Sequence, residues 1–573
     1  ISEDYEGASK ASNNCCEKCV VKIQSDISGF YKKNSSKFKL FLQVVLLMLY
    51  FVYFGYALYY NFGDEGSIRL LTCTSIGLFL IILKVSGQLI TRRIKDTPEC
   101  FTRIASNIRL RLFVRFLRII VFIVLIVYII IDVALENPSN LTSVGGMAAY
   151  LVIMYLTSTN PSKVIWHPVF WGIVLQYMFA LLILRTYWGY EVFTWLGERL
   201  AEFLSYADEG AKFVFDKDYY TRHNFAFKIM PIVVYFSTVI NVLYYLGVMQ
   251  FFVKHFGRFL SFCLNTTPAE SVNAAANMFV SMTEAPLMIK PFLEDMTDSE
   301  FHAVMTGGFA TVAGGVFGAY IAFGVPANHL LSASIMSAPA ALAISKLTCP
   351  ETETTIKNKR DFLKMAKPPE KDIIAAASSG ATQSIKLVAT IVVNVMAFLS
   401  LLKFVNSTLA WFGDRIGVAN LSFQLICSYA LFPVSFFMGT EISDCRKVAE
   451  LVGIKTFTNE FIAYDALSTL IHNKERFLNY TSQYNDTEAW KWDGDNMILT
   501  YWDNHVLVGG IISDRSTVIA TYALCGFSNF GSIGITLGVL STLAPSKKGV
   551  LSKLVMRAMI AGNVACFLTA CIA

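Results

Sequence analysis

Long apolar stretches recur along the chain and are separated by short polar connections. Each approaches the roughly 20 apolar residues that a helix needs to cross the hydrocarbon core of a bilayer. The clearest six are Leu40–Tyr60, Ile68–Ile90, Leu112–Ala134, Val164–Leu184, Ile229–Val248 and Val388–Val405. A helix satisfies its backbone hydrogen bonds within one segment, as the bilayer interior requires. The pattern therefore predicts an all-α polytopic membrane protein.

Two further apolar segments carry an acid where the hydrocarbon makes it costly. The first, "NMFVSMTEAPLMIKPF", contains Glu284 and Pro286, and the second, "TFTNEFIAYDALSTL", contains Asn459 and Glu460. A charged side chain and a helix-breaking proline both cost free energy at membrane depth. Irregular backbone persists there only when it is buried in protein or lines a cavity. We therefore expect two re-entrant helical hairpins, each with an acid at its tip.

A glycine-rich broken helix follows each hairpin. The stretch "GGFATVAGGVFGAY" is predicted to break at Ala313–Gly315, and "ATYALCGFSNFGSIGITLG" at Phe527–Ser532. A whole helix comes next, Leu330–Leu347 in the first case and Val555–Ile572 in the second. Interrupted segments at corresponding positions of two halves indicate a transporter site at the bilayer midplane. The fold expected is an inverted-repeat transporter with two hairpins and two broken helices, preceded by three extra N-terminal spans.

The polar side chains of these interruptions suit a neutral, hydroxyl-rich solute. Glu284 and Glu460 can accept hydrogen bonds, while Asn529 and Ser532 can both donate and accept them. A cationic solute would leave the amide and the hydroxyl without a role. The sequence therefore favours a neutral solute over a cation.

Composition and charge set the orientation in the membrane. Hydrophobic residues make up 54% of the chain and charged residues 16%, with a mean hydropathy of +0.50, whereas soluble domains contain about 25% charged residues. Basic residues gather in four connections, which the positive-inside rule places in the cytoplasm. They are Lys32, Lys33, Lys37 and Lys39; Arg92, Arg93, Lys95, Arg103, Arg109, Arg111 and Arg115; Lys357, Lys359, Arg360, Lys364, Lys367 and Lys371; and Lys547, Lys548 and Lys553. Nucleic-acid binding is not needed to explain them.

The same rule places the N-terminus in the cytoplasm and the C-terminus outside the cell. Three Asn-x-Thr glycosylation sequons, at Asn140, Asn479 and Asn485, fall in the outer loops. If the C-terminus lies outside the cell, the chain must enter Leu421–Gly439 and leave Ile442–Leu470 on the same side of the membrane. The path of the first of these two segments is left open.

The chain begins at Ile1 and ends within an apolar run, so we expect the natural protein to extend beyond both ends. Cys15, Cys16 and Cys19 lie on the inner side, where they are either palmitoylated or simple reduced thiols. The predicted regions are a cytoplasmic segment (1–38), three extra transmembrane helices (39–136), scaffold and oligomerisation helices (137–265), a first transport repeat (266–350), a cytoplasmic linker with a scaffold helix (351–420) and a second transport repeat with a glycosylated outer loop (421–573).

Three motifs in fixed order resemble those of the concentrative nucleoside transporter family. The family's Gly-Gln-Thr-Glu-(Ser/Ala)-Pro, Asn-Glu-Phe-Val-Ala-Tyr and Cys-Gly-Phe-(Ala/Ser)-Asn correspond here to Ser281-Met282-Thr283-Glu284-Ala285-Pro286, Asn459-Glu460-Phe461-Ile462-Ala463-Tyr464 and Cys525-Gly526-Phe527-Ser528-Asn529. The resemblance covers roughly Phe227 to Ala573, and the extra N-terminal spans are typical of animal members. It implies a sodium-coupled nucleoside transporter of the plasma membrane, surrounded by lipid and assembled as a homotrimer.

The resemblance also implies a role for individual residues. The nucleobase would contact the tip of the first hairpin and two further side chains: Ser281, Met282, Thr283, Glu284, Val316 and Phe527. The ribose hydroxyls would be held by Glu460, Asn529 and Ser532. The co-transported sodium ion would be bound by the Asn277 side chain, the Val280 and Val312 carbonyls and the Thr311 hydroxyl. Oxygen ligands of this kind suit a hard cation.

Two departures from the family motifs concern the choice of base. Met282 stands where the family usually has Gln, and within the family Met here accompanies purine preference. Ser281, where the family usually has Gly, accompanies pyrimidine preference. Gly315 has no side chain and leaves room for a larger base on the opposite side of the expected binding site. Two of the three features favour purine nucleosides, so we expect a purine preference.

The function expected is sodium-coupled import of nucleosides. The alternatives within transport are proton coupling and facilitated diffusion of nucleosides or nucleobases. A different class is an intramembrane enzyme that uses Glu284 and Glu460 as an acid and base, although the chain contains no HExxH or Gly-x-Ser-x-Gly motif. We therefore expect a transporter and not an enzyme, with no nucleic-acid partner. The ratio of sodium to nucleoside is left open.

Overall fold

The computed structural model describes residues 44–59, isolated positions between 70 and 131, and residues 138–216, 224–353, 370–415, 417, 421–484 and 489–573. The chain divides into two units, Ile1–Ile126 and Val127–Ala573, and each is described by itself. In the first unit, the helix Val44–Tyr59 lies within the first predicted span. The three inner cysteines, most of the second and third predicted spans, most of the basic connections and Asn485 lie outside the described residues.

The second unit is mainly helical, which agrees with the all-α prediction. Its helices are α5 (Leu141–Leu156), α6 (Trp166–Ala180), α7 (Tyr187–Ser205), α8 (Ala207–Phe215), α9 (Met230–Tyr245), α10 (Val248–Leu264), α11 (Pro268–Ala276), α12 (Ala285–Met288), α13 (Lys290–Leu293), α14 (Asp298–Ala310), α15 (Gly314–Ala322), α16 (Ala327–Thr348), α17 (Ile373–Arg415), α18 (Phe423–Ala430), α19 (Phe432–Met438), α20 (Cys445–Phe457), α21 (Glu460–Gln483), α22 (Asp514–Leu524), α23 (Phe530–Leu543) and α24 (Lys548–Ile572). Among the described residues, six helical segments are long and apolar enough to cross a membrane. Three of them contain most of the predicted spans that begin at Val164, Ile229 and Val388.

The helix breaks differ slightly from their predicted positions. The first separates α14 from α15 at residues 311–313, and the second separates α22 from α23 at residues 525–529. Gly314, Gly315 and Ser532 therefore lie inside helices. The reason at the second break is capping: the Asn529 side chain accepts a hydrogen bond from the Ser532 N–H, so the helix resumes directly after Asn529.

The segment Leu421–Gly439, whose path the sequence left open, forms two short helices. Helix α18 ends at Ala430, and α19 begins at Phe432 with Pro433 in its first turn. A proline is accepted in the first turn of a helix, where its missing N–H needs no partner, but it interrupts a helix interior. The left-handed Gly439 (φ +91°) then ends α19 before the second hairpin.

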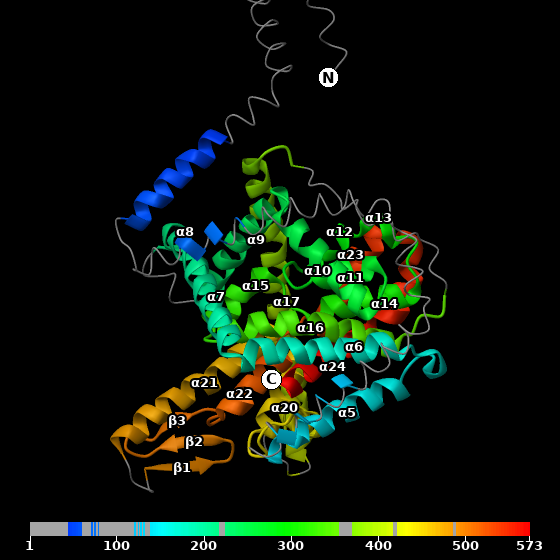
Figure 1. Cartoon of the computed structure of the whole chain (residues 1–573). Helices are drawn as coiled ribbons and strands as arrows, with labels where there is room; N and C mark the ends of the chain where they lie inside the picture. The colour runs from blue at the N-terminus through cyan, green and yellow to red at the C-terminus, as the bar shows by residue number, and fades with distance from the viewer. Residues whose placement is uncertain are drawn as a thin grey trace, which may run out of the picture. The chain divides into compact units, whose positions relative to one another are not determined.

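A small antiparallel sheet lies between α21 and α22, which the all-α prediction did not include. Its strands are β1 (Trp490–Asp493), β2 (Asn496–Leu499) and β3 (His505–Leu507), in the order β1-β2-β3. Asp493 pairs with Asn496 across a two-residue turn that contains Gly494 (φ +61°). The apolar face of the sheet packs on Tyr480 of α21, beside which it lies in Figure 1.

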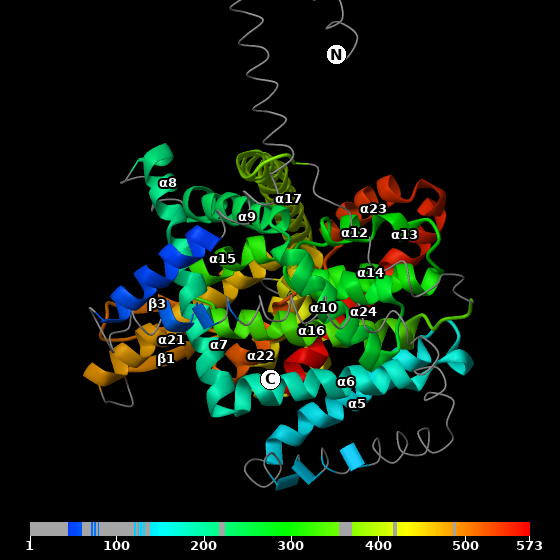
Figure 2. The same cartoon turned by 45° about the horizontal axis from the view of Figure 1, so that its top comes forward.

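Helix α16 lies in the core of the second unit, where it packs against α6 and α24. Figures 1 and 2 both show α6 and α16 side by side. A Cβ at Gly172 of α6 would lie 2.7 Å from the Ala343 Cβ of α16, so only glycine permits this approach. Gly562 does the same for α24, where a Cβ would lie 2.5 Å from the Phe309 Cβ of α14. Close contacts at glycine thus join α6 to α16 and hold α14, the first half of a broken helix, against α24.

The bases of the two predicted hairpins lie at opposite ends of α24. Ser546, just before α24, hydrogen-bonds to Glu294, which follows the first hairpin (α11 to α13). Cys571, near the end of α24, donates to the Phe437 carbonyl of α19, which leads into the second hairpin (α20 and α21). Helix α24 has 25 residues and is therefore about 37 Å long. The bases of the two hairpins are separated by most of this length.

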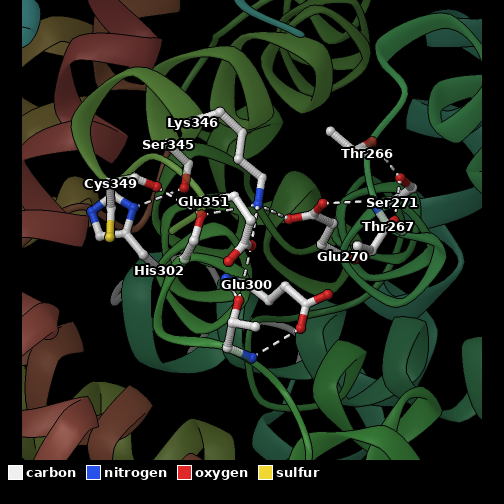
Figure 3. A network of polar contacts seen from close by, with 12 residues as sticks. Thr266, Thr267, Glu270, Ser271, Glu300, His302, Ser345, Lys346, Cys349 and Glu351 are labelled. Atoms are coloured by element: carbon white, nitrogen blue, oxygen red, sulfur yellow. Dashed lines mark hydrogen bonds and ion pairs between the residues drawn. The ribbon is translucent and has the colours of Figure 1, made fainter. Parts of the chain in front are cut away.

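A buried network joins the base of the first hairpin to its neighbours (Figure 3). The Lys346 ammonium of α16 lies 2.8 Å from the Glu270 carboxylate of α11 and 3.0 Å from the Ser299 hydroxyl of α14. Glu351 lies 3.6 Å from the same ammonium. Removing one partner of a buried ion pair costs about 3–5 kcal/mol, so this network fixes three helices at one end of the repeat.

Candidate functional site

One cavity brings the two hairpins and the two helix breaks together. The empty space between its walls is about 640 Å³, which includes volume open to solvent. Eight of the nine predicted solute-binding residues line it: Ser281, Met282, Thr283, Val316, Glu460, Phe527, Asn529 and Ser532. Among the described residues that line it, Glu460 is the one charged side chain. The cavity therefore combines apolar walls with a few grouped polar atoms.

Two helix N-termini converge on the Glu460 carboxylate. Glu460 is the first residue of α21 and is 2% exposed, and Asn529 immediately precedes α23. The Asn529 Nδ2 donates to Glu460 Oε2 at 2.7 Å, while its Oδ1 accepts from the Ser532 N–H at 2.8 Å. The positive end of a helix stabilises a nearby carboxylate. The Asn529 amide is thus fixed in one orientation and holds the carboxylate at the cavity wall.

The tip of the first hairpin forms another part of the wall. The Ser281 and Thr283 hydroxyls lie 2.6 Å apart, and the Thr536 hydroxyl of α23 donates to the Met282 sulfur at 3.5 Å. Glu284 does not line the cavity. Its carboxylate turns back and accepts from the Ser281 N–H at 3.2 Å, which satisfies a backbone donor in the turn.

Two of the four predicted sodium ligands, Asn277 and Thr311, lie against the same residue, Gly307 of α14, near the first break. The Gly314 N–H donates to the Phe279 carbonyl at 3.3 Å, which ties the hairpin tip to the start of α15. Asn277 is 1% exposed, yet neither its Oδ1 nor its Nδ2 has a hydrogen-bond partner among the described residues. Its amide packs on Gly307, whose carbonyl accepts from the Thr311 hydroxyl at 2.8 Å. A buried carboxamide oxygen without a partner fits a position that takes an ion.

The sequence analysis missed the contribution of α17 to the cavity. Leu387, Thr390, Ile391, Asn394 and Phe398 line it from this helix. Their spacing of three and four residues puts them on one helical face. The signal was present, because Thr390 and Asn394 are polar residues one turn apart within or beside an apolar span, but a lone Thr or Asn in a span usually bonds its own helix.

Three protein families match consecutive parts of the chain. They are "Na+ dependent nucleoside transporter N-terminus" at residues 145–218, "Nucleoside recognition" at 226–327 and "Na+ dependent nucleoside transporter C-terminus" at 329–573. The cavity described above is built entirely from the last two.

Curated relatives match over most of the chain. It is 49% identical over 447 residues to "Solute carrier family 28 member 3" of Mus musculus, covering 77% of this chain and 60% of that protein. The protein of the same name from Homo sapiens is 42% identical over 563 residues, covering 97% of this chain and 76% of that protein. The chain thus spans less than two thirds of the mouse relative's length.

A solved structure of the transporter CNTnw "in an inward-facing substrate-bound state" superimposes with a TM-score of 0.66. It is 31% identical and covers 76% of this chain and 97% of that chain. The two chains therefore share a fold over this part of their length.

Proposed function

Because this chain belongs to the sodium-dependent nucleoside transporter family, we propose that it imports nucleosides across the plasma membrane in symport with sodium. The observation that carries the proposal is the cavity in which Glu460 and Asn529 share a wall with the tip of the first hairpin. Nucleoside binding by Glu460 would explain why an acid is buried at membrane depth, where its burial costs free energy.

The ribose is assigned to the Glu460 side of the cavity. A carboxylate fixed by Asn529 still has acceptor positions for sugar hydroxyls, and the Ser532 hydroxyl, 4% exposed, lies one helical turn further along α23. The nucleobase is assigned to Met282, Val316 and Phe527, which supply apolar and polarizable surface. In this arrangement Glu284 supports the turn through Ser281, and its contact with a base requires the side chain to rotate out of that hydrogen bond.

Sodium is assigned to Asn277, Thr311 and the carbonyls of Val280 and Val312. The unpartnered Asn277 amide supports this assignment, because an unpaired buried polar group costs about 1–3 kcal/mol unless something binds it. At roughly −100 mV, one inward positive charge releases about 2.3 kcal/mol. A tenfold sodium gradient adds about 1.4 kcal/mol, so the sum of about 3.7 kcal/mol supports accumulation of a neutral solute several hundredfold.

Uptake of labelled nucleoside by cells that express the chain tests the proposal. We expect accumulation above the external concentration in sodium medium and its collapse when choline replaces sodium. Uptake that continues in choline but follows an inward proton gradient would favour proton coupling, and equilibration without accumulation would favour a facilitator. Either of these results contradicts sodium symport.

The enzyme alternative receives no support from the arrangement of the two acids. Glu460 lines the cavity, whereas Glu284 hydrogen-bonds back to its own turn. An acid and base pair must reach the same reacting atoms. The two carboxylates do not share such a position.

The proposed orientation has support from contacts at the two ends of α24. Arg515, at the start of α22, donates to the Ser139 hydroxyl beside the sequon at Asn140. Ser143, just after this sequon, donates to the Met438 carbonyl of α19, the same helix that Cys571 of α24 contacts. Lys547 and Lys548 lie at the opposite end. We therefore propose that the hairpins are re-entrant from opposite faces, with an outer C-terminus and a cytoplasmic N-terminus. Assembly as a lipid-embedded homotrimer and the three extra N-terminal spans stay predictions.

Met282→Gln is expected to raise uptake of uridine relative to adenosine about tenfold. The thioether offers a weak acceptor and adaptable apolar contact, which favours the larger purine surface, whereas a Gln amide can donate and accept at a base edge. A hydrogen bond worth about 1.4 kcal/mol corresponds to the tenfold change. Competition by each nucleoside against labelled adenosine is the measurement.

The control for this variant is Met278→Gln, a buried methionine that does not line the cavity. It should leave the ratio of the two nucleosides unchanged. If uridine competes best in the unmodified protein and Met282→Gln has no effect on the ratio, the expected purine preference is wrong.

A further inference from the structure

Lys455 is a fully buried cation that the proposed transport cycle does not use. It lies in the last turn of α20, the first arm of the second hairpin, and its side chain is 0% exposed. Among the residues that the structure describes, no carboxylate lies within 4.0 Å of its ammonium. The Nζ donates instead to the carbonyl of Ala523 at 3.0 Å. The Glu460 carboxylate interacts electrostatically with this ammonium from a greater distance, and the buried Nζ needs a second source of negative potential in direct contact with it.

The end of α22 supplies that potential. The last four carbonyls of a helix have no partner within it, and the C-terminus carries a partial negative charge of about half a unit. Ala523 lies in the last turn of α22, which contains no basic residue of its own. The positive charge at the end of α22 therefore comes from a different helix, through the side chain of Lys455 on α20.

The first repeat has the same geometry but lacks the cation. Helix α14 also stops at a break and has no basic residue in its last turn. Asn277, which directly follows the first arm of the first hairpin, places its amide against Gly307 in that last turn. In both repeats a polar side chain thus reaches from the end of the first hairpin arm to the end of the first half-helix. In the first repeat it is a neutral amide without a partner, and in the second it is an ammonium.

The two helix ends also lie close together. The Cys566 sulfur of α24 lies 2.9 Å from the Cys525 carbonyl oxygen after α22 and 3.6 Å from the Ala310 carbonyl oxygen of α14, so its single S–H lies between the two helix ends. A Cβ at Gly526 would lie 2.7 Å from the Phe309 carbonyl oxygen. Two negative helix ends that meet in a low-dielectric interior repel each other, so a positive charge at each end would stabilise the pair.

We propose that Lys455 is a tethered cation, which occupies in the second repeat the place that sodium occupies in the first. The second repeat then binds no ion of its own, because the protein carries the charge permanently. Lys455 moves with the hairpin in both directions, so it contributes nothing to the net charge transported. This inference rests on the proposed sodium position at Asn277 and Thr311.

Lys455→Met and Lys455→Arg test the proposal. Methionine keeps much of the side-chain volume without the charge, and arginine keeps the charge. The measurements are the sodium activation of nucleoside uptake and the charge moved per nucleoside, from simultaneous current and tracer flux. With methionine we expect the half-activating sodium concentration to rise about tenfold or more. We also expect the charge per nucleoside to rise by about one, because a second sodium ion now fills the vacated position. Arginine should keep both values.

Lys447→Met is the matched control, since Lys447 lies on the same helix but bonds the Ile511 carbonyl at the base of the hairpin. It should leave the charge per nucleoside unchanged. The proposal is overturned if Lys455→Met lowers the maximal rate alone, with wild-type sodium activation and charge ratio, since that is the signature of a purely structural lysine.

A second readout covers the case in which Lys455→Met does not transport. The melting temperature of the purified full chain is measured against sodium concentration. We expect the methionine variant to melt lower than the unmodified protein without sodium and to gain more from added sodium. An equal or smaller gain overturns the proposal. Unmodified protein whose uptake does not depend on sodium would instead contradict the proposed function, independently of either variant.

Discussion

Glu460→Gln is expected to lower nucleoside uptake at limiting substrate by about 10-fold to 150-fold, while the protein still reaches the cell surface. The carboxylate accepts from the Asn529 amide at 2.7 Å and, in the proposed complex, from ribose hydroxyls. Hydrogen bonds to a charged group contribute about 1.5–3 kcal/mol each, and a Gln side chain replaces one acceptor by a donor. Asn529 cannot compensate by turning over, because its oxygen caps α23. Initial rates of labelled nucleoside uptake, normalised to surface protein, measure the effect.

The matched control is Asp465→Asn, which removes an acid from the exposed face of the same helix. It should transport like the unmodified protein. The assignment of Glu460 to the sugar also predicts that nucleosides without ribose hydroxyls compete weakly, and that the Gln variant discriminates less against them. Transport by Glu460→Gln at the normal rate and affinity would show that the sugar binds elsewhere.

Asn277→Ala is expected to raise the half-activating sodium concentration about tenfold or more, before the maximal rate falls. The change removes a buried side-chain oxygen that has no hydrogen-bond partner within the described part of the chain, so no hydrogen bond seen there is lost. An ion at this position loses a ligand, and a loss of about 1.4 kcal/mol corresponds to the tenfold shift. Thr311→Ala should act in the same direction, since the hydroxyl lies beside the same helix end. Sodium-activation curves at saturating nucleoside are the measurement.

Ser271→Ala controls for a general loosening of the first hairpin. Ser271 lies earlier on α11, is buried, and its hydroxyl donates to the Thr267 carbonyl at 2.8 Å. Its loss should lower the melting temperature without moving the sodium dependence. If the Asn277 and Thr311 variants both keep normal half-activation, the ion binds at another position.

The sequence predicted the site from residues that cost free energy within a membrane segment, because such residues are kept only for a reason. An acid beside proline in "MTEAP" and the glycine-rich stretches around residues 311 and 526 are expensive in a membrane segment, and such costs indicate a site. Three of the four side chains chosen on that basis, Glu460, Asn529 and Ser532, line one cavity, and so do five residues that the family resemblance added. Both breaks lie a few residues from their predicted positions, and the second does so because the Asn529 side chain caps α23, which depends on its rotamer.

Contacts between distant segments could not be read from the sequence. Glu284 and Glu460 occupy corresponding motif positions, yet one bonds its own turn and the other lines the cavity. Thr390 and Asn394 join the site only because α17 packs beside the breaks. Nothing local distinguishes Lys455 from an ordinary basic residue near a helix end. Its proposed role follows from its contact with Ala523, which is 68 residues away along the chain and whose carbonyl oxygen lies 3.0 Å from the Lys455 Nζ.

The amino-acid sequence by itself determined that this is a mainly helical membrane protein with two acid-bearing interruptions, because periodicity, hydropathy and the free-energy cost of a buried acid are properties of single segments. The tertiary structure alone decided which of the two acids faces the cavity, that the Asn277 amide has no hydrogen-bond partner among the described residues, and that the Lys455 ammonium contacts the helix end at the second break. The physical reason is that hydrogen-bond satisfaction and electrostatic potential depend on every group within a few ångströms, and packing brings those groups together from across the chain.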